Sequence, residues 1–145
     1  MANVRDILRR KGHQVMSIDP AASVLDAATS MNDQKIGALV VCNQGKVAGI
    51  ITERDVLRRI VAHRKDPAHT TVADAMTNEV ICCQLDTPVD EVRSIFMNER
   101  IRHLPVVGDQ DEIAGLISIG DLNAFDLDGK EVTIRYLHEY LYGAA

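Results

Sequence analysis

Two short turns in the sequence combine residue types that could bind the sugar and the phosphate of a nucleotide. Thr52 is followed three residues later by Asp55, and Ser118 is followed at the same spacing by Asp121. Each turn lies where a predicted strand ends and a predicted helix begins, so free N–H groups and the positive end of the helix dipole could attract a phosphate. The carboxylate has two acceptor oxygens, which suit the vicinal hydroxyls of a ribose. The alternative is that the hydroxyls cap the helices and the aspartates are favourable first-turn acids.

A second group of polar side chains begins a predicted buried strand. Arg102 and His103 are adjacent there, so strand alternation directs them to opposite faces. A phosphate held by Arg102 would accept charge-assisted hydrogen bonds. Pro105 has no N–H to give to a sheet, so we expect it at an edge or a strand start, where a ligand can approach. The alternative is a solvated arginine and a surface histidine beside a strand.

The two turns belong to two copies of one motif of about 50 residues. When the sequence is aligned with itself, Ile36 matches Ile101 at an offset of 65 residues, and Gly49 matches Gly115 at an offset of 66. One residue inserted in the turn at 108–112 explains the change, because turns tolerate insertions that strands do not.

Each copy predicts the order strand, helix, strand, strand, helix. In the first copy, strands are expected at 15–18, 38–42 and 47–52, with a tight hairpin turn at 43–46. Ser23 caps the first helix. A second helix begins near Glu53 and is expected to bury four apolar residues, Val56, Leu57, Ile60 and Val61.

The second copy and the flanking segments complete the expected fold. Thr87 is the expected helix cap, with Pro88 as the first helical residue. Helices are also expected at 4–11, ending at Gly12, and at 133–142, ending at Gly143. A polar loop at 63–70 and a short helical turn at 72–76 link the copies, which we expect to pack about a pseudo-twofold axis because neither half buries enough apolar surface alone.

The composition indicates one folded domain and excludes several classes of function. The chain has 145 residues, of which 46 % are apolar and 26 % charged. Its apolar runs are far shorter than the roughly 20 residues of a membrane helix, and no secretory signal is evident, so we expect a cytoplasmic protein. The net charge of −5 argues against general affinity for nucleic acid or anionic lipid. The basic stretch at 54–65 is interpreted as a solvated helix face, with a nucleic-acid surface as the alternative.

Cysteines and histidines give weaker signals. The odd number of cysteines, with Cys82 and Cys83 adjacent, does not form a disulfide framework and fits a reducing compartment. This pair lies on a predicted strand and is interpreted as buried and structural, with a redox sensor as the alternative. The five histidines show no metal-ligand spacing, so no metal site is predicted. No nucleophile lies in a recognisable triad or elbow motif.

The repeated pattern resembles the CBS domain family, whose regulatory modules carry this motif in tandem. The matching segments are IGALVV (36–41) with GIITERD (49–55), and IRHLPVV (101–107) with GLISIGD (115–121), helped by VADAM (72–76). The ending YLHEYLYG (136–143) is similar to that of bacterial stand-alone CBS pairs. The resemblance implies an α/β (α+β) fold, with a first motif at 13–62, a second at 72–126 and a C-terminal helix at 130–143.

The resemblance also implies adenosine nucleotides as ligands, such as AMP, ATP or NAD(H) and sometimes S-adenosylmethionine, in two clefts between the copies. The first site would comprise Thr52, Arg54, Asp55, Ile81, Arg102, His103 and Pro105. The second would comprise Met16, Gly37, Ala38, Val40, Ser118, Gly120 and Asp121. In the second site Gly37 and Ala38 replace Arg102 and His103, so both phosphate donors are lost and a weaker grip on phosphate is expected.

The resemblance therefore implies a non-catalytic sensor of adenine nucleotides, which forms a homodimer and acts on an unidentified effector protein. A first alternative is a dimerisation or protein-interaction module whose clefts hold no physiological nucleotide. A second is a redox or hydrolytic enzyme that uses the cysteine pair or His103. Resemblance of fold alone does not choose among them, because function depends on the site.

Overall fold

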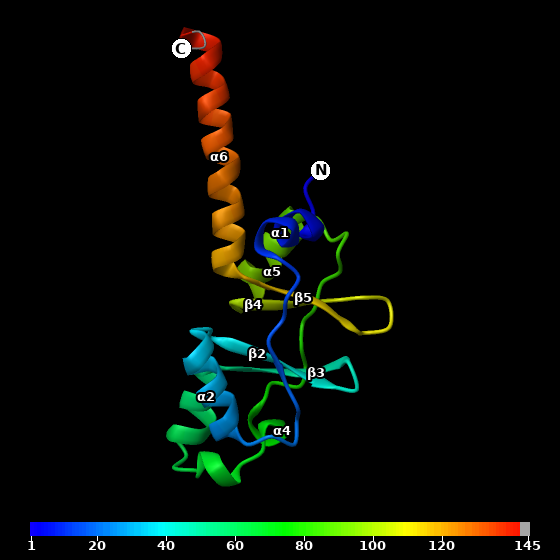
Figure 1. Cartoon of the computed structure of the whole chain (residues 1–145), viewed down its shortest axis with the longest axis vertical. Helices are drawn as coiled ribbons and strands as arrows, with labels where there is room; N and C mark the ends of the chain where they lie inside the picture. The colour runs from blue at the N-terminus through cyan, green and yellow to red at the C-terminus, as the bar shows by residue number, and fades with distance from the viewer. Residues whose placement is uncertain (143–145) are drawn as a thin grey trace.

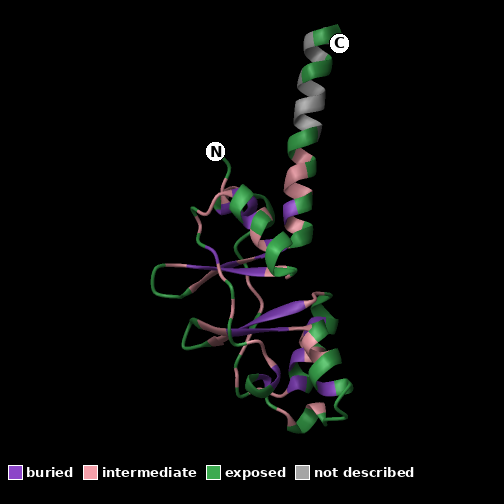
Figure 2. Cartoon of the chain, turned by 180° about the vertical axis from the view of Figure 1, so that it is seen from behind, coloured by how far each residue is buried: buried purple, intermediate pink, exposed green. Residues whose placement is uncertain are grey.

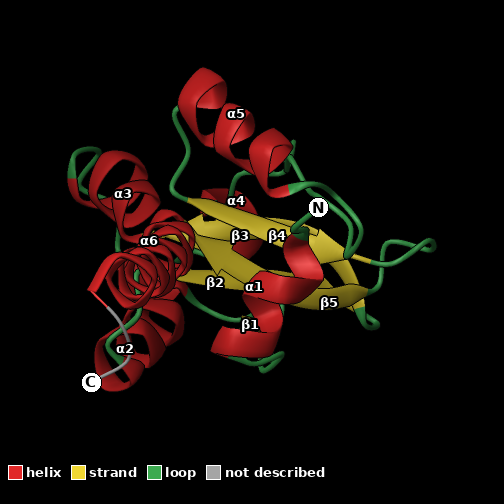
Figure 3. Cartoon of the chain, turned by 90° about the horizontal axis from the view of Figure 1, so that it is seen from above, coloured by secondary structure: helices red, strands yellow, loops and turns green. Residues whose placement is uncertain are grey.

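The computed structural model describes the backbone of residues 1–142, and their side chains except those of 131–136 and 139–140. Two small sheets lie face to face in the middle of the molecule, and helices cover their outer faces (Figure 1). Seen from above, the strands of the two sheets overlap, and a long helix stands at one end of them (Figure 3).

The first half contains a three-stranded sheet. β1 (Ser17–Ile18) pairs in parallel with β2 (Ala38–Asn43), which pairs antiparallel with β3 (Lys46–Thr52). The two-residue turn between β2 and β3 has positive φ at both Gln44 and Gly45, as the twist of a tight hairpin requires. The helices of this half are α2 (Val24–Gln34), α3 (Glu53–Asp55), the π-helical η1 (Val56–Val61) and α4 (Val72–Ala75), and a 3₁₀ turn, η2 (Pro67–His69), precedes α4.

The second half contains a two-stranded sheet of the same design. β4 (His103–Val107) pairs antiparallel with β5 (Ile113–Ser118). The hairpins have a register shift at equivalent places, between Val41 and Cys42 and between Val106 and Val107, as expected for two copies of one motif. The helices of this half are α1 (Val4–Lys11), α5 (Val89–Glu99) and α6 (Ile119–Tyr142).

Each half completes its core with a segment from outside its own motif. Val4, Ile7 and Leu8 of α1 pack in the core of the second half, whereas Val72 and Ala75 of α4 pack in that of the first. The crossing segments are tied by backbone hydrogen bonds, including Val4 N–H to the Thr87 carbonyl at 2.9 Å. The two halves therefore form one domain, because separating them would expose both cores.

A buried layer separates the two sheets. Leu39, Val41 and Ile51 face the helices of the first half, so strand alternation turns Val40 and Ile50 toward the second sheet. The burial pattern in Figure 2 shows the strands as the most enclosed part of the molecule.

Three predictions about the local structure are wrong, and a fourth, the C-terminal helix, is right except for the residue at which the helix begins. The strand expected at 15–18 is only Ser17–Ile18, although the Met16 carbonyl still accepts a hydrogen bond from the Val40 N–H at 3.3 Å. Cys83 forms an isolated bridge to Val106 rather than part of a strand. Thr87 does not cap α5, because its hydroxyl accepts a hydrogen bond from the Gln84 N–H, and Pro88 takes the cap position instead. The predicted helix at 133–142 is the outer part of α6, which begins at Ile119, and the predicted stop at Gly143 lies outside the described residues.

The prediction for the helix after Glu53 is wrong at two of its four buried positions. Ile60 is buried and Val56 partly so, but Leu57 and Val61 are each 61 % exposed. The wide π turn places residues four apart on one line, so Val56 and Ile60 face the core while Leu57 and Val61 lie further round the helix. The second pair leaves an apolar patch at the surface.

Candidate functional site

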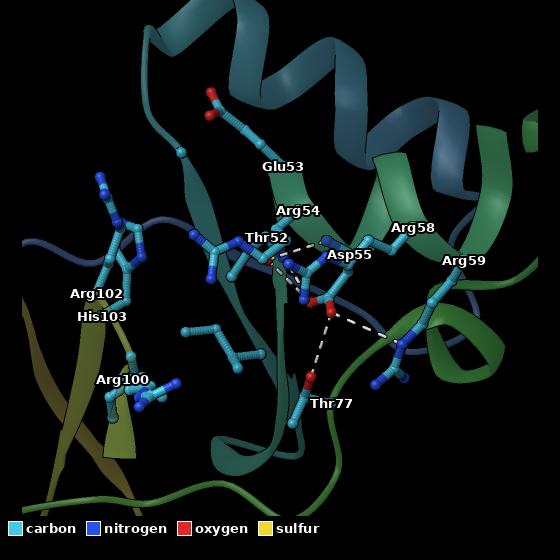
Figure 4. Close-up of a pocket in the computed structure, with 13 residues that line it drawn as sticks. Thr52, Glu53, Arg54, Asp55, Arg58, Arg59, Thr77, Arg100, Arg102 and His103 are labelled. Carbon is cyan, nitrogen blue, oxygen red and sulfur yellow. Dashed lines mark hydrogen bonds and ion pairs between the residues drawn. The ribbon is translucent and has the colours of Figure 1, made fainter. Parts of the chain in front are cut away.

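A cleft of about 430 Å³ lies between the two halves. The turn from β3 into α3 forms one wall, and the segment entering β4 forms the other (Figure 4). Five of the seven residues predicted for the first site line it: Thr52, Arg54, Asp55, Arg102 and His103.

Ile81 and Pro105 do not line this cleft. Pro105 is buried in the middle of β4, where its carbonyl accepts a hydrogen bond from the Cys83 N–H at 2.9 Å. Pro105 is therefore not at a strand start, but the other expected position, an edge, is confirmed, because β4 belongs to a two-stranded sheet and the Pro105 carbonyl points away from β5. Ile81 lies on the segment linking the halves and is 37 % exposed.

The turn from Thr52 to Asp55 is a capping box. The Thr52 N–H donates to Asp55 Oδ2 at 3.0 Å, and the Asp55 N–H donates to Thr52 Oγ1 at 3.2 Å. The capping interpretation is therefore confirmed. The other carboxylate oxygen, Oδ1, has the Thr77 hydroxyl at 3.3 Å and Arg59 Nε at 3.8 Å, which are weak contacts. Asp55 is thus held in a fixed orientation with Oδ1 available to a ribose hydroxyl.

Sequence reasoning missed much of the positive charge in this cleft. Arg58 and Arg59 of η1 and Arg100 at the end of α5 line it together with Arg54 and Arg102. The basic stretch is exposed as predicted, yet three of its arginines face the cleft. Spacing could have added Arg58, because it follows the predicted site residue Arg54 by four positions, and helical residues four apart share a face.

His103 lines both this cleft and a second one. Burial lowers the pKa of His103 below its ordinary value, and the positive charge of Lys11 lowers it further. The imidazole is therefore neutral at physiological pH and can donate from only one ring nitrogen. It is available to a ligand as a hydrogen-bonding group rather than as a cation.

The second cleft, of about 360 Å³, lies on the pseudo-symmetric side of the molecule. Met16, Gly37, Ala38, Ser118 and Asp121 line it as predicted. Val40 does not, because it is fully buried between the sheets, and neither does Gly120, which is exposed on the first turn of α6. The turn repeats the capping geometry, with the Ser118 N–H donating to Asp121 Oδ2 at 2.8 Å and the Asp121 N–H to Ser118 Oγ at 3.1 Å.

Lys11 enters the second cleft from α1 and pairs with Asp121. Its ammonium lies 2.6 Å from Asp121 Oδ2 and also donates to the Leu116 carbonyl. Burial acts to raise the pKa of Asp121, but the Lys11 ammonium and the Ser118 N–H outweigh it and hold that pKa below its ordinary value. Lys35 lines the same cleft. The second cleft has Gly37 and Ala38 where the first has the donors Arg102 and His103. Lys11 and Lys35, which do not correspond to those two donors in the repeat, supply positive charge to the second cleft.

The other candidate chemistries find no geometric support. Burial raises the pKa of Cys83 to about 12 and also raises that of Cys82, so both thiols are protonated at neutral pH. Among the residues with described side chains, no group of three or more histidine, cysteine or acidic residues could hold a metal ion. No helix in the described part of the chain is long and apolar enough to cross a membrane.

Comparison with known proteins identifies relatives across nearly the whole chain. The sequence matches the CBS domain family at residues 4–62 and 72–127. It is 34 % identical to the CBS domain-containing protein CBSX3, mitochondrial, of Arabidopsis thaliana, over 97 % of this chain and 72 % of that protein.

Two solved structures share the fold. The CBS domain protein NE2398 is 36 % identical, with a TM-score of 0.82, over 87 % of this chain and 98 % of that one. The CBS domain pair of MJ0100, solved in complex with 5′-methylthioadenosine and S-adenosyl-L-methionine, is 28 % identical, with a TM-score of 0.74, over 90 % of this chain and 98 % of that one. The predicted tandem α/β fold is confirmed.

Proposed function

The chain belongs to the CBS domain family, and we propose that it is a non-catalytic sensor that binds adenosine nucleotides in the two clefts between its motifs. It is a CBS-pair regulatory module. The observation that carries the proposal is the first cleft, where Asp55 faces Arg102 and His103 across the gap between the halves. One ligand with both a ribose and a phosphate would contact both walls.

The contacts match the parts of the nucleotide in turn. Asp55 Oδ1 is an acceptor for a ribose hydroxyl, and the Arg102 guanidinium is a donor for phosphate. Ile50 and Ile101 supply aliphatic lining that could take an adenine ring. The adenosine ligands of the MJ0100 structure support the same ligand class here.

A bound nucleotide would act by changing the relative position of the two halves. The halves meet at the hairpin turns. The backbone of Lys46 forms an isolated antiparallel β-bridge with that of Glu112, and the Val47 N–H donates to the Asp111 carbonyl at 3.1 Å. A ligand that bridges the walls shifts this arrangement by its differential affinity for the open and closed forms. We further propose that the exposed apolar patch of Leu57 and Val61 contributes to a homodimer, through which the change reaches an effector protein.

Calorimetric titration of ligand-free protein with AMP, ATP, NAD(H) and S-adenosylmethionine tests the proposal. We expect saturable binding of at least one of them, weakened about tenfold by Asp55→Ala, because a hydrogen bond to a charged group contributes roughly 1.5–3 kcal/mol. Asp74→Ala is the matched control, because Asp74 is also a first-turn acid but lies outside both clefts.

The alternative interaction module makes the opposite prediction. A ligand that binds the folded state must raise the midpoint of thermal unfolding. Unchanged midpoints with every adenosine ligand at millimolar concentration, together with a stable dimer, would favour the interaction module and contradict the proposed sensor.

A further inference from the structure

We infer that the first cleft selects a nucleoside 5′-polyphosphate over a monophosphate or a dinucleotide, with Arg58 and Arg100 as the residues that recognise the added phosphates. This inference rests on the proposed function of the cleft. It follows from the number of cations in the cleft and from their lack of partners.

The cleft carries far more positive charge than one phosphate needs. Five guanidinium groups line it, against two carboxylates, in a chain whose net charge is −5. Arginine stays protonated in proteins, so this charge persists at any physiological pH. Concentrating like charges in a cleft of about 430 Å³ is unfavourable unless an anion enters.

Most of these guanidinium groups have no partner among the residues whose side chains the structure describes. Arg59 donates to the Met76 carbonyl at 2.8 Å and approaches Asp55, so its position has a structural role. The side chains of Arg54, Arg58, Arg100 and Arg102 have no hydrogen bond or ion pair within the described part of the chain. Four forked donors are therefore free for a ligand, and each can hold two phosphate oxygens.

The positions of the four arginines suggest that different arginines bind different phosphates of one ligand. Arg54 and Arg58 come from the wall formed by α3 and η1, and Arg100 and Arg102 from the opposite wall (Figure 4). Glu53 points away from Arg58, toward Gly37, so its carboxylate does not pair with Arg58. Arg54 and Arg102, beside the capping-box turn and His103, suffice for the first phosphate. Arg58 and Arg100 then remain for the phosphates beyond it.

The two other nucleotide classes fit these donors less well. A monophosphate would leave Arg58 and Arg100 without partners. A dinucleotide such as NAD(H) carries only two phosphates, both bridged between nucleosides, so it brings less charge and an additional nucleoside. An adenosine triphosphate offers acceptor oxygens to all four groups.

Calorimetry in EDTA at low and moderate salt tests this inference, with adenosine, AMP, ADP, ATP, NAD(H) and inorganic tripolyphosphate as ligands. Measurements use the Lys11→Met, Asp121→Ala protein, which lacks the ribose acceptor of the second cleft and the ammonium that the loss of this carboxylate would leave without an ion-pair partner. We expect affinity to rise from AMP through ADP to ATP, with ATP at least tenfold tighter than AMP and the most sensitive to salt. Tripolyphosphate should bind more weakly than ATP, because it has no ribose for Asp55.

Variants identify the residues. Arg58→Gln and Arg100→Gln should each weaken ATP about tenfold and AMP less than twofold, because a charge-assisted hydrogen bond is lost only with the longer ligand. Arg64→Gln is the control, since it removes the same charge just beyond η1 but outside the cleft.

The outcomes separate this inference from the proposed function. Equal or tighter binding of AMP, equal losses of AMP and ATP in Arg58→Gln and Arg100→Gln, or tripolyphosphate binding as tightly as ATP would overturn the selectivity and leave nucleotide binding standing. Binding of none of the adenosine ligands would refute both.

Discussion

Replacing Lys11 by methionine should destabilise the protein and at the same time improve adenosine binding in the second cleft. The Lys11 ammonium lies 2.6 Å from Oδ2 of Asp121, the residue proposed to bind the ribose of a ligand. A ribose that donates to both carboxylate oxygens must displace this ammonium, because Lys11 and the Ser118 N–H both contact Oδ2. Methionine keeps the length of the side chain and removes the charge.

The structure sets the size of both effects. The two side chains are 29 % and 23 % exposed, so the pair is less screened than a surface pair but not fully buried. We expect it to contribute about 1 kcal/mol, between the values for exposed pairs and for charged hydrogen bonds. Its loss should lower the midpoint of thermal unfolding by roughly 2–4 °C for a chain of this size. Because adenosine no longer has to break this ion pair, the affinity of the second cleft for adenosine should rise by the same energy, about fivefold.

The assay combines calorimetric titration of adenosine with measurements of stability as a function of pH. Adenosine is titrated into Lys11→Met in the Asp55→Ala background, so that the second cleft is the site observed. Because the pKa of Asp121 is depressed, its contribution to stability is full above the unfolded value of about 4 and is lost as the pH falls through the lower folded value. The Lys11→Met protein should therefore lose less stability on acidification than the wild type. Lys35→Met, which removes a charge from the same cleft without breaking the pair, should leave the pH profile unchanged. Weaker adenosine binding in Lys11→Met would refute the competition between Lys11 and ribose.

Two further predictions concern the fold that positions the clefts. A Cβ at Gly49 would lie 2.8 Å from the Thr77 carbonyl and 2.5 Å from Met76 Sδ, so Gly49→Ala should cost about 1–3 kcal/mol. Gly129→Ala in the interior of α6 should be neutral or stabilise by up to about 1 kcal/mol, because alanine has the higher helix propensity. Urea denaturation measures both, and equal stability of the two variants would contradict the close approach at Gly49. Burial and a pKa of about 12 should protect Cys83 from iodoacetamide at pH 8 until urea unfolds the chain, and mass spectrometry that found rapid labelling of the native protein would contradict this burial.

The repeat made the sheets and turns predictable. Both hairpins, the capping-box turns and the short turn at 72–76 depend on neighbouring residues, and the structure has all of them. Element ends were less accurate, because they depend on competition between caps. The Thr87 hydroxyl, for example, accepts a hydrogen bond from the Gln84 N–H instead of capping α5.

The contents of the clefts were harder to predict, because they depend on packing between distant segments. Lys11 reaches Asp121 only because α1 crosses to the second half. Arg100 faces the first cleft because the chain turns there, with φ of 55° at the end of α5. Val40 and Pro105 were assigned to sites by resemblance, but the sheet-to-sheet layer and the centre of β4 bury them. The single continuous α6 was missed because a helix interior tolerates one glycine, Gly129, at a cost of only about 1 kcal/mol.

The central claim, that an adenosine nucleotide binds between the two motifs at the first cleft, is tested most directly by amide chemical-shift mapping during a titration with ATP. We predict saturable shifts that cluster at Thr52, Asp55, Thr77, Arg102 and His103, on both walls of the cleft. Absence of saturable shifts, or shifts confined to residues that do not line the first cleft, would contradict the account.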